Sequence, residues 1–197
     1  MINALRIVVA DDEPDVLEHF KECLEALGHQ VVAAVGNGAD LVERCRALHP
    51  DLVITDIKMP DLDGIQAAEK VRLDHPTPVI LVSAYHDPDL IDRALADHVL
   101  AYLVKPIRKD NLKPAIALAM QRFKEFQALQ HQADDLRQAL EDRKIVERAK
   151  GILMKRGNLD EQSAFTRLQK LASDKNRKMV EIARMIVTAE EAFTADD

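Results

Sequence analysis

Short apolar runs alternate with helix-like stretches through the first 120 residues, and this alternation constrains the fold more than any other feature of the sequence. The runs are rich in aliphatic and β-branched residues, as strands buried on both faces of a sheet usually are. Strands are predicted at residues 7–10, 31–35, 52–56, 78–83 and 102–105, and the helices between them at 14–27, 39–48, 65–74 and 87–97. The sequence therefore predicts an α/β fold with a doubly wound, five-stranded parallel sheet.

No strand pattern follows residue 111, and the rest of the chain is predicted to be helical. Apolar residues then recur with 3,4,3,4 spacing, which is typical of a coiled coil; they are Phe126, Leu129, Ala133, Leu136 and Leu140. We expect this stripe to form a homodimer. Three further helices are predicted, the second opening at Asn158 with Glu161 as a capping pair. The predicted divisions are a domain at 1–120, a helical linker at 121–140 and a helical domain at 141–197.

Charge is distributed unequally along the chain. Residues 1–120 hold 12 Lys and Arg against 20 Asp and Glu, a balance of -8, whereas residues 136–193 hold 13 against 9, a balance of +4. The basic part could bind an anionic polymer, or its cations could simply form solvated helix faces. No apolar run approaches the ~20 residues that cross a bilayer, and the start is unlike a signal peptide, so we expect a cytoplasmic protein.

Several chemically active residues fall at predicted strand ends. Asp11 and Asp12 follow the first strand, Asp56 ends the third, Ser83 the fourth and Lys105 the fifth. Alone, a strand-ending aspartate is often only a turn former or helix cap. Because the ends of parallel strands share one edge, however, these side chains should lie together. Close carboxylates repel one another unless a hard cation lies among them, which predicts a Mg²⁺ site able to receive a phosphoryl group.

With these residues in view, residues 4–120 resemble the flavodoxin-like receiver domain of two-component response regulators. The matching positions are Asp11-Asp12, Asp56, Met59-Pro60, Gly64, Ser83, Tyr102 and Lys105-Pro106. The resemblance implies that a sensor histidine kinase phosphorylates Asp56. It also implies that Mg²⁺ is held by Asp11 or Asp12, by Asp56 and by the backbone carbonyl of Lys58. Phosphorylation would then be sensed by Ser83, Tyr102 and Lys105.

This sequence departs from the receiver pattern in two places. His98-Val99 stands where the family usually has Gly-Ala, so the backbone of the turn before the fifth strand could differ. Tyr85, two residues after Ser83, is bulky and could slow the access of water to an aspartyl phosphate.

Residues 136–190 resemble a second module, the ANTAR domain of transcription antitermination regulators. The segment Ala149-Lys150-Gly151-Ile152-Leu153-Met154 carries the most specific part of the resemblance. It implies binding of RNA hairpins by a dimer. The cations available for RNA phosphates are Arg143, Arg148, Lys150, Lys155, Arg156, Arg177 and Lys178. Aromatic side chains for base stacking are scarce, and we expect Phe165 to be buried in the core.

Together these features predict a phosphorylation-dependent antiterminator rather than an enzyme. Alternatives are a regulator whose output binds DNA, or one whose output binds protein. A DNA-binding helix is weakly supported, since the helix after Gly157 carries only Arg167 and Lys170 as cations. A phosphatase or phosphotransferase is weakly supported because Lys58, rather than a second carboxylate, stands two residues beyond Asp56.

Overall fold

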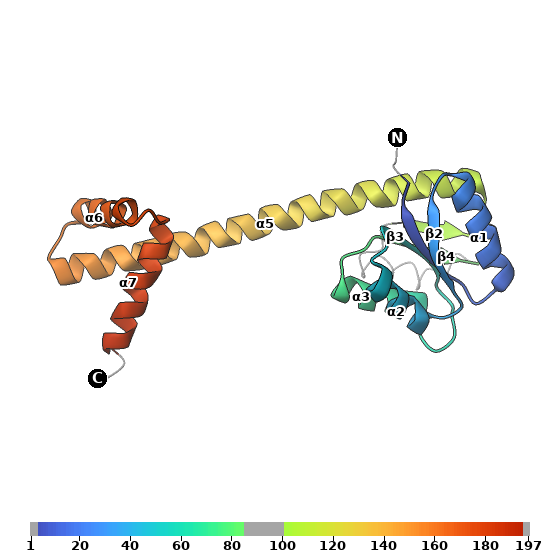
Figure 1. Ribbon diagram of the computed structural model, residues 1–197, viewed down its shortest axis with the longest axis horizontal. Helices are drawn as coiled ribbons and strands as arrows, with labels where there is room; N and C mark the ends of the chain where they lie inside the picture. The colour runs from blue at the N-terminus through green and yellow to red at the C-terminus, as the bar shows by residue number, and fades with distance from the viewer. Residues whose placement is uncertain (1–3, 85–100, 195–197) are drawn as a thin grey trace. The chain divides into compact units, whose positions relative to one another are not determined.

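The computed structural model describes residues 4–84 and 101–194 (Figure 1). The predicted helix at 87–97, Tyr85 and His98-Val99 lie outside the described residues. The chain divides into two compact units, residues 1–127 and 128–197. In the described part of the chain, no helix is apolar over a length that could cross a membrane.

The first unit is built on a parallel sheet of five strands in the order β2-β1-β3-β4-β5. The strands are β1 (Arg6–Ala10), β2 (Gln30–Val35), β3 (Leu52–Asp56), β4 (Val79–Ser83) and β5 (Ala101–Val104). The predicted fold class is confirmed, and the strand bounds differ from prediction by at most one residue at each end. This order places a topological switch point at β1 and β3, the position where open α/β sheets bind ligands.

Two apolar clusters cover the two faces of the sheet, packed by α1 (Pro14–Ala26), α2 (Gly38–Leu48), α3 (Gly64–Asp74) and the start of α5 (Lys109–Gly157). Alternate residues of β1 point to opposite faces, so Val8 lies in the cluster with α2 and α3 while Val9 lies in the cluster with α1 and α5. Buried strands therefore hold the C-terminal edge of the sheet rigidly.

Two glycines lie against the loop that follows β3: Gly64, the first residue of α3, and Gly38, the first residue of α2. A Cβ atom on Gly64 would lie 1.9 Å from the carbonyl oxygen of Asp56, and one on Gly38 would lie 2.3 Å from the carbonyl oxygen of Leu62. Both distances are far below van der Waals contact, so only glycine fits at either position. A capping box between Asp63 and Gln66 then starts α3 directly after the loop.

Helix α5 runs without interruption from Lys109 to Gly157, because no glycine or proline occurs between residues 115 and 150. It begins earlier than predicted, so Pro114 lies in its second turn rather than its first. The coiled-coil stripe is exposed on this helix, with Leu129, Leu136 and Leu140 exposed by 65%, 67% and 58%. These leucines make a face that a partner could cover.

The second unit packs the end of α5 against α6 (Glu161–Asp174) and α7 (Met179–Thr194). The core is built from small and aliphatic residues, as a three-helix cluster requires: Ala149, Leu168, Ala172, Ile182, Ala183 and Val187. Two predictions for α6 are wrong. Its N-cap is Asp160, which accepts from the amide of Ser163, rather than Asn158. Phe165 is 42% exposed rather than buried in the core. Ala164 points into the core, and the next residue of an α-helix is rotated by about 100° around the helix axis, which turns Phe165 toward solvent.

The two cysteines should differ sharply in reactivity. Cys45 is buried, and burial raises the pKa of its thiol from 9.0 to about 12, whereas Cys23 is half-buried. A pKa of about 12 in place of 9.0 leaves about a thousandfold less reactive thiolate on Cys45 near neutral pH than the same thiol would have without burial. Iodoacetamide near neutral pH should therefore modify Cys23 alone in the folded protein and both thiols after unfolding, as intact mass would show. Equal modification of both thiols before unfolding would contradict this.

Candidate functional site

Four predicted site residues stand together at the C-terminal edge of the sheet. Asp11 follows β1, Asp56 and Ser83 are the last residues of β3 and β4, and Lys105 follows β5. The ammonium Nζ of Lys105 lies 2.8 Å from Oδ2 of Asp11 and 3.1 Å from Oδ1 of Asp56. Two carboxylates from neighbouring strands therefore share one cation at the topological switch point.

The carboxylate of Asp56 is buried and held at both oxygens. Oδ1 faces Lys105, and Oδ2 accepts a hydrogen bond of 2.7 Å from the backbone amide of Lys58. Burial raises the pKa of the Asp56 carboxyl above its ordinary value, although the charge and hydrogen bond of Lys105 lower it. The neighbouring Asp11 adds a smaller increase. A carboxylate with a fixed orientation and little hydration suits an attacking nucleophile.

Lys105 has a third partner that sequence reasoning missed. Glu13 Oε1 lies 3.2 Å from its Nζ. Burial alone would lower the pKa of Lys105, but the hydrogen bonds and charges of Asp11 and Asp56 outweigh it, and the pKa is raised. Lys105 therefore stays cationic. The three consecutive acids at residues 11–13 were the available sequence signal for Glu13.

The carboxylates suit a hard cation in chemistry. Oδ2 of Asp11 is buried and makes no well-aligned hydrogen bond within the described residues; its close contact is the ion pair with Lys105. Asp12 is exposed beside it. Among the described residues, no three His, Cys, Asp or Glu side chains form a metal-binding group on their own. A cation here would need oxygens other than carboxylates, such as a backbone carbonyl and water, which Mg²⁺ commonly accepts.

Ser83 lies on β4, next to β3, and Tyr102 lies on β5, one strand further from β3. Ser83 is buried, and its carbonyl accepts from the amide of Lys105 at 2.8 Å, so the two positions are tied by the backbone. Tyr102 on β5 is half-buried against the apolar cluster beneath α2 and α3. The phosphoryl-sensing role of Ser83 and Tyr102 stays a prediction.

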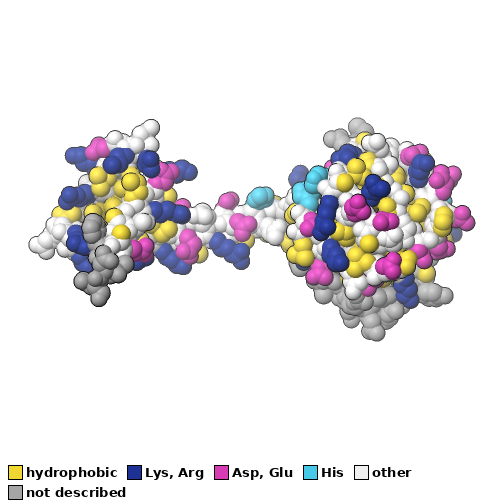
Figure 2. Space-filling model, turned by 60° about the horizontal axis from the view of Figure 1, so that its bottom comes forward, with side chains coloured by type: hydrophobic (Ala, Val, Ile, Leu, Met, Phe, Trp, Pro, Cys, Tyr) yellow, Lys and Arg dark blue, Asp and Glu magenta, His cyan; other side chains and the backbone are white. Residues whose placement is uncertain are grey.

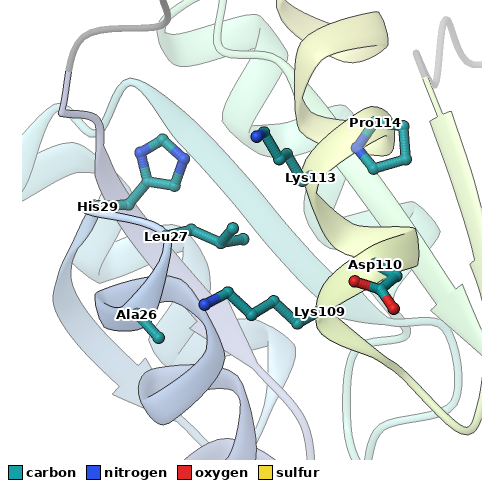
Figure 3. A pocket seen from close by; sticks show the side chains of 7 residues that line it. All are labelled: Ala26, Leu27, His29, Lys109, Asp110, Lys113 and Pro114. Atoms are coloured by element: carbon teal, nitrogen blue, oxygen red, sulfur yellow. The ribbon is translucent and has the colours of Figure 1, made fainter.

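A separate cavity of about 640 Å³ lies between α1 and α5, away from the strand ends. Figure 3 shows Lys109 and Lys113 extending into it from α5, opposite His29 and Leu27. None of the predicted site residues lines it. It is therefore distinct from the cluster of Asp11, Asp56 and Lys105.

The predicted RNA-binding cations of the second unit fall into three groups. Arg143, Lys155, Arg177 and Lys178 are exposed, and within the described residues none of these four makes an ion pair with a carboxylate. Arg148 and Arg156 are exposed but paired with acids of α7. Figure 2 shows Lys and Arg side chains around an apolar patch on one face of this unit. The unit therefore presents several cations to a polyanion.

Lys150 forms the third group alone. It is only 8% exposed, and its Nζ lies 2.7 Å from carboxylate oxygens of both Glu147 and Glu161. Hydrogen bonds and charges from these two acids raise its pKa. Lys150 thus joins α5 to α6, which leaves its ammonium little freedom to reach a phosphate.

Comparison with known proteins matches each unit to a family. Residues 7–117 match the response regulator receiver domain and residues 134–187 match the ANTAR domain. The transcriptional regulatory protein PdtaR of Mycobacterium tuberculosis is 38% identical over 182 residues, 92% of this chain and 89% of the relative. The chemotaxis protein CheY of Bacillus subtilis is 34% identical over 114 residues, 57% of this chain and 95% of the relative.

A solved structure agrees with these matches. The signal receiver domain of NarL from Mycobacterium tuberculosis is 31% identical with a TM-score of 0.58, covering 61% of this chain and 98% of that one. Receiver domains are partners of sensor kinases and generally bind Mg²⁺ at their phosphorylation site. With an ANTAR output, the arrangement is that of a phosphorylation-dependent regulator that binds RNA and antiterminates transcription. The chain belongs to the response regulators, as a member in which an ANTAR domain follows the receiver domain.

Proposed function

We propose that Asp56 is the phosphoacceptor and that its phosphorylation controls RNA binding by the helices of the second unit. The observation that supports this most is the pair of carboxylates, Asp11 and Asp56, sharing the Lys105 ammonium at the sheet edge. An oxygen of Asp56 attacks the phosphorus of a kinase phosphohistidine. The phosphorus–nitrogen bond breaks, the histidine ring leaves, and an aspartyl phosphate remains.

Neighbouring residues have separate roles in this transfer. Lys105, already 3.1 Å from Asp56 Oδ1, can move onto a phosphoryl oxygen with little rearrangement. The Ser83 hydroxyl donates a hydrogen bond to another phosphoryl oxygen. Tyr102 then turns inward behind Ser83. Asp11, Asp12, Asp56 and the Lys58 carbonyl are the proposed ligands of Mg²⁺, which would offset the negative charge of the phosphoryl group.

In the second unit, we propose that RNA phosphates contact the exposed cations. These are Arg143, Arg148, Lys155, Arg156, Arg177 and Lys178. Lys150 was also predicted as a contact; its burial between two glutamates favours a role in joining α5 to α6 instead. Arginine planes and the exposed ring of Phe165 are available for stacking of loop bases.

RNA binding should depend steeply on salt. The full-length phosphorylated protein should bind an RNA with two adjacent hairpins, and log Kd should rise linearly with log salt. Each phosphate contact contributes a slope of roughly 0.7 to 0.9, so Lys155→Ala and Lys178→Ala, which each remove one contact per chain, should each lower the slope by roughly 1.4 to 1.8 in a dimer. Filter binding across a salt series measures this. Tighter binding to duplex DNA of equal length would defeat the proposal and favour the DNA-binding alternative.

We also propose a homodimer through the exposed stripe of α5, favoured by phosphorylation. Sedimentation at micromolar concentration should show a dimer, since exposed leucines at coiled-coil spacing are unfavourable in water. Each buried leucine contributes about 2 kcal/mol, so Leu136→Lys, which acts in both chains, should weaken the dimer at least about a hundredfold. Gln130→Lys, off the stripe, is the matched control. Sedimentation of the phosphorylated protein as a monomer would refute the proposed homodimer.

A further inference from the structure

Two of the proposed RNA contacts are already occupied by acids of the same unit. Arg148 lies 2.8 Å from Glu191 Oε1, and the Nε of Arg156 lies 3.1 Å from Glu190 Oε2. Both glutamates stand near the C-terminal end of α7, and both arginines stand on α5. The end of α7 therefore places two carboxylates in ion pairs with two arginines that we propose as RNA contacts.

Carboxylates and phosphates engage a guanidinium through the same donors. A phosphate can bind Arg148 or Arg156 fully only by displacing the glutamate. Displacement is feasible, since the two arginine side chains are about 60% exposed and ion pairs at the surface are weak. The displaced carboxylate would remain nearby and repel the RNA backbone. Arg143, Lys155 and Lys178 carry no such competitor among the described residues.

The position of these acids is not explained by helix stability. The negative end of the helix dipole lies at the C-terminus of α7, where carboxylates are unfavourable and cations are favoured. The last turn of α7 contains no basic residue. The local preference of the helix therefore disfavours Glu191, which lies in that turn, and its ion pair with Arg148 offsets this.

We propose that Glu190 and Glu191 form an autoinhibitory contact, competing with RNA phosphates for Arg156 and Arg148 and so setting the RNA affinity of the domain. The proposal rests on the proposed function, because it assumes that these arginines meet RNA. It assigns to α7 a part in regulating the same surface rather than only a part in its core.

The test uses the full-length protein and an RNA with two adjacent hairpins whose loop bases are randomised. Such a pool measures sequence-independent phosphate contacts, so no specific target is needed. Glu190→Gln/Glu191→Gln should bind about tenfold more tightly at low salt, with the gain shrinking as salt rises. The control Asp135→Asn/Glu181→Gln removes the same charge from two exposed acids that make no ion pair within residues 4–84 and 101–194, and it should gain less than about threefold.

A second pair of variants ties the gain to the arginines. In an Arg148→Ala/Arg156→Ala background, the two glutamine substitutions should gain no more than the control does, because only the general loss of negative charge remains when the arginines are absent. Glu191→Gln alone, at an exposed position, serves if the double variant does not fold. If the wild type binds RNA and the variant gains no more than the control, the autoinhibitory contact is refuted and RNA binding stands. If neither the wild type nor the variants bind, the proposed function fails with it.

Discussion

Asp56→Asn should abolish phosphorylation of the protein by acetyl phosphate and by a kinase. The substitution keeps the size of the side chain but leaves one acceptor oxygen for the two donors, Lys105 and the Lys58 amide, and an amide is a very poor nucleophile. Loss of a covalent nucleophile commonly costs several orders of magnitude in rate, so incorporation should fall to background. Radiolabel incorporation or intact mass after incubation with acetyl phosphate and Mg²⁺ measures it.

A matched control separates loss of the acceptor from loss of charge. Asp61→Asn changes an exposed carboxylate in the loop after β3, at a positive φ of 65° that asparagine tolerates well. It should leave incorporation close to that of the wild type. Persistent labelling of Asp56→Asn at the wild-type rate would refute the assignment of the phosphoacceptor, because another side chain would then carry the phosphoryl group.

Gly64→Ala should cause the largest loss of stability among conservative substitutions near the site. Its new Cβ would lie 1.9 Å from the carbonyl oxygen of Asp56, an atom of the backbone that cannot rotate aside. Either α3 or the end of β3 must shift, which should cost about 3 kcal/mol or more and lower Tm by about 10 °C. Thermal unfolding followed by circular dichroism measures the change, and slower phosphorylation should accompany it.

Gly36→Ala is the control in the same unit. The nearest atom to its Cβ would be the carbonyl oxygen of Asp11 at 4.0 Å, an ordinary contact. Its stability should stay within about 1 kcal/mol of the wild type. If Gly36→Ala and Gly64→Ala lower Tm equally, the clash with the carbonyl oxygen of Asp56 is not the reason that residue 64 must be glycine.

The sheet could be predicted from the sequence because its signal is local. Each strand is a compact apolar run, such as residues 79–83. A strand buried on both faces is apolar throughout, whereas a half-exposed strand alternates apolar and polar residues and is harder to recognise. The start of α5 was harder to place. Proline has no amide hydrogen, so it is usually found in the first turn of a helix, where the amides have no partner in the helix. In α5, Pro114 lies in the second turn instead.

Site residues on strand ends were predictable for the same reason, since parallel topology alone brings Asp11, Asp56 and Lys105 together. Partners set by packing between helices were not. Whether Lys150 faces solvent or pairs with Glu161 depends on how α6 packs against α5. The spacing of residues along the sequence does not predict that packing. Phe165 shows the same limit, because a single residue step on α6 decides between core and surface.

A Cβ atom on Gly38 would lie 2.3 Å from the carbonyl oxygen of Leu62, so a side chain at this position requires the backbone to move. The loop after β3 keeps its course because there is no side chain at Gly38 or Gly64, not because of a contact that selection on signalling could relax. A descendant that lost Asp56 and its phosphorylation would therefore still lose stability if either glycine were replaced. Their persistence in a degenerate copy would record ancestry and foldability, and would say nothing about whether that copy still receives a signal.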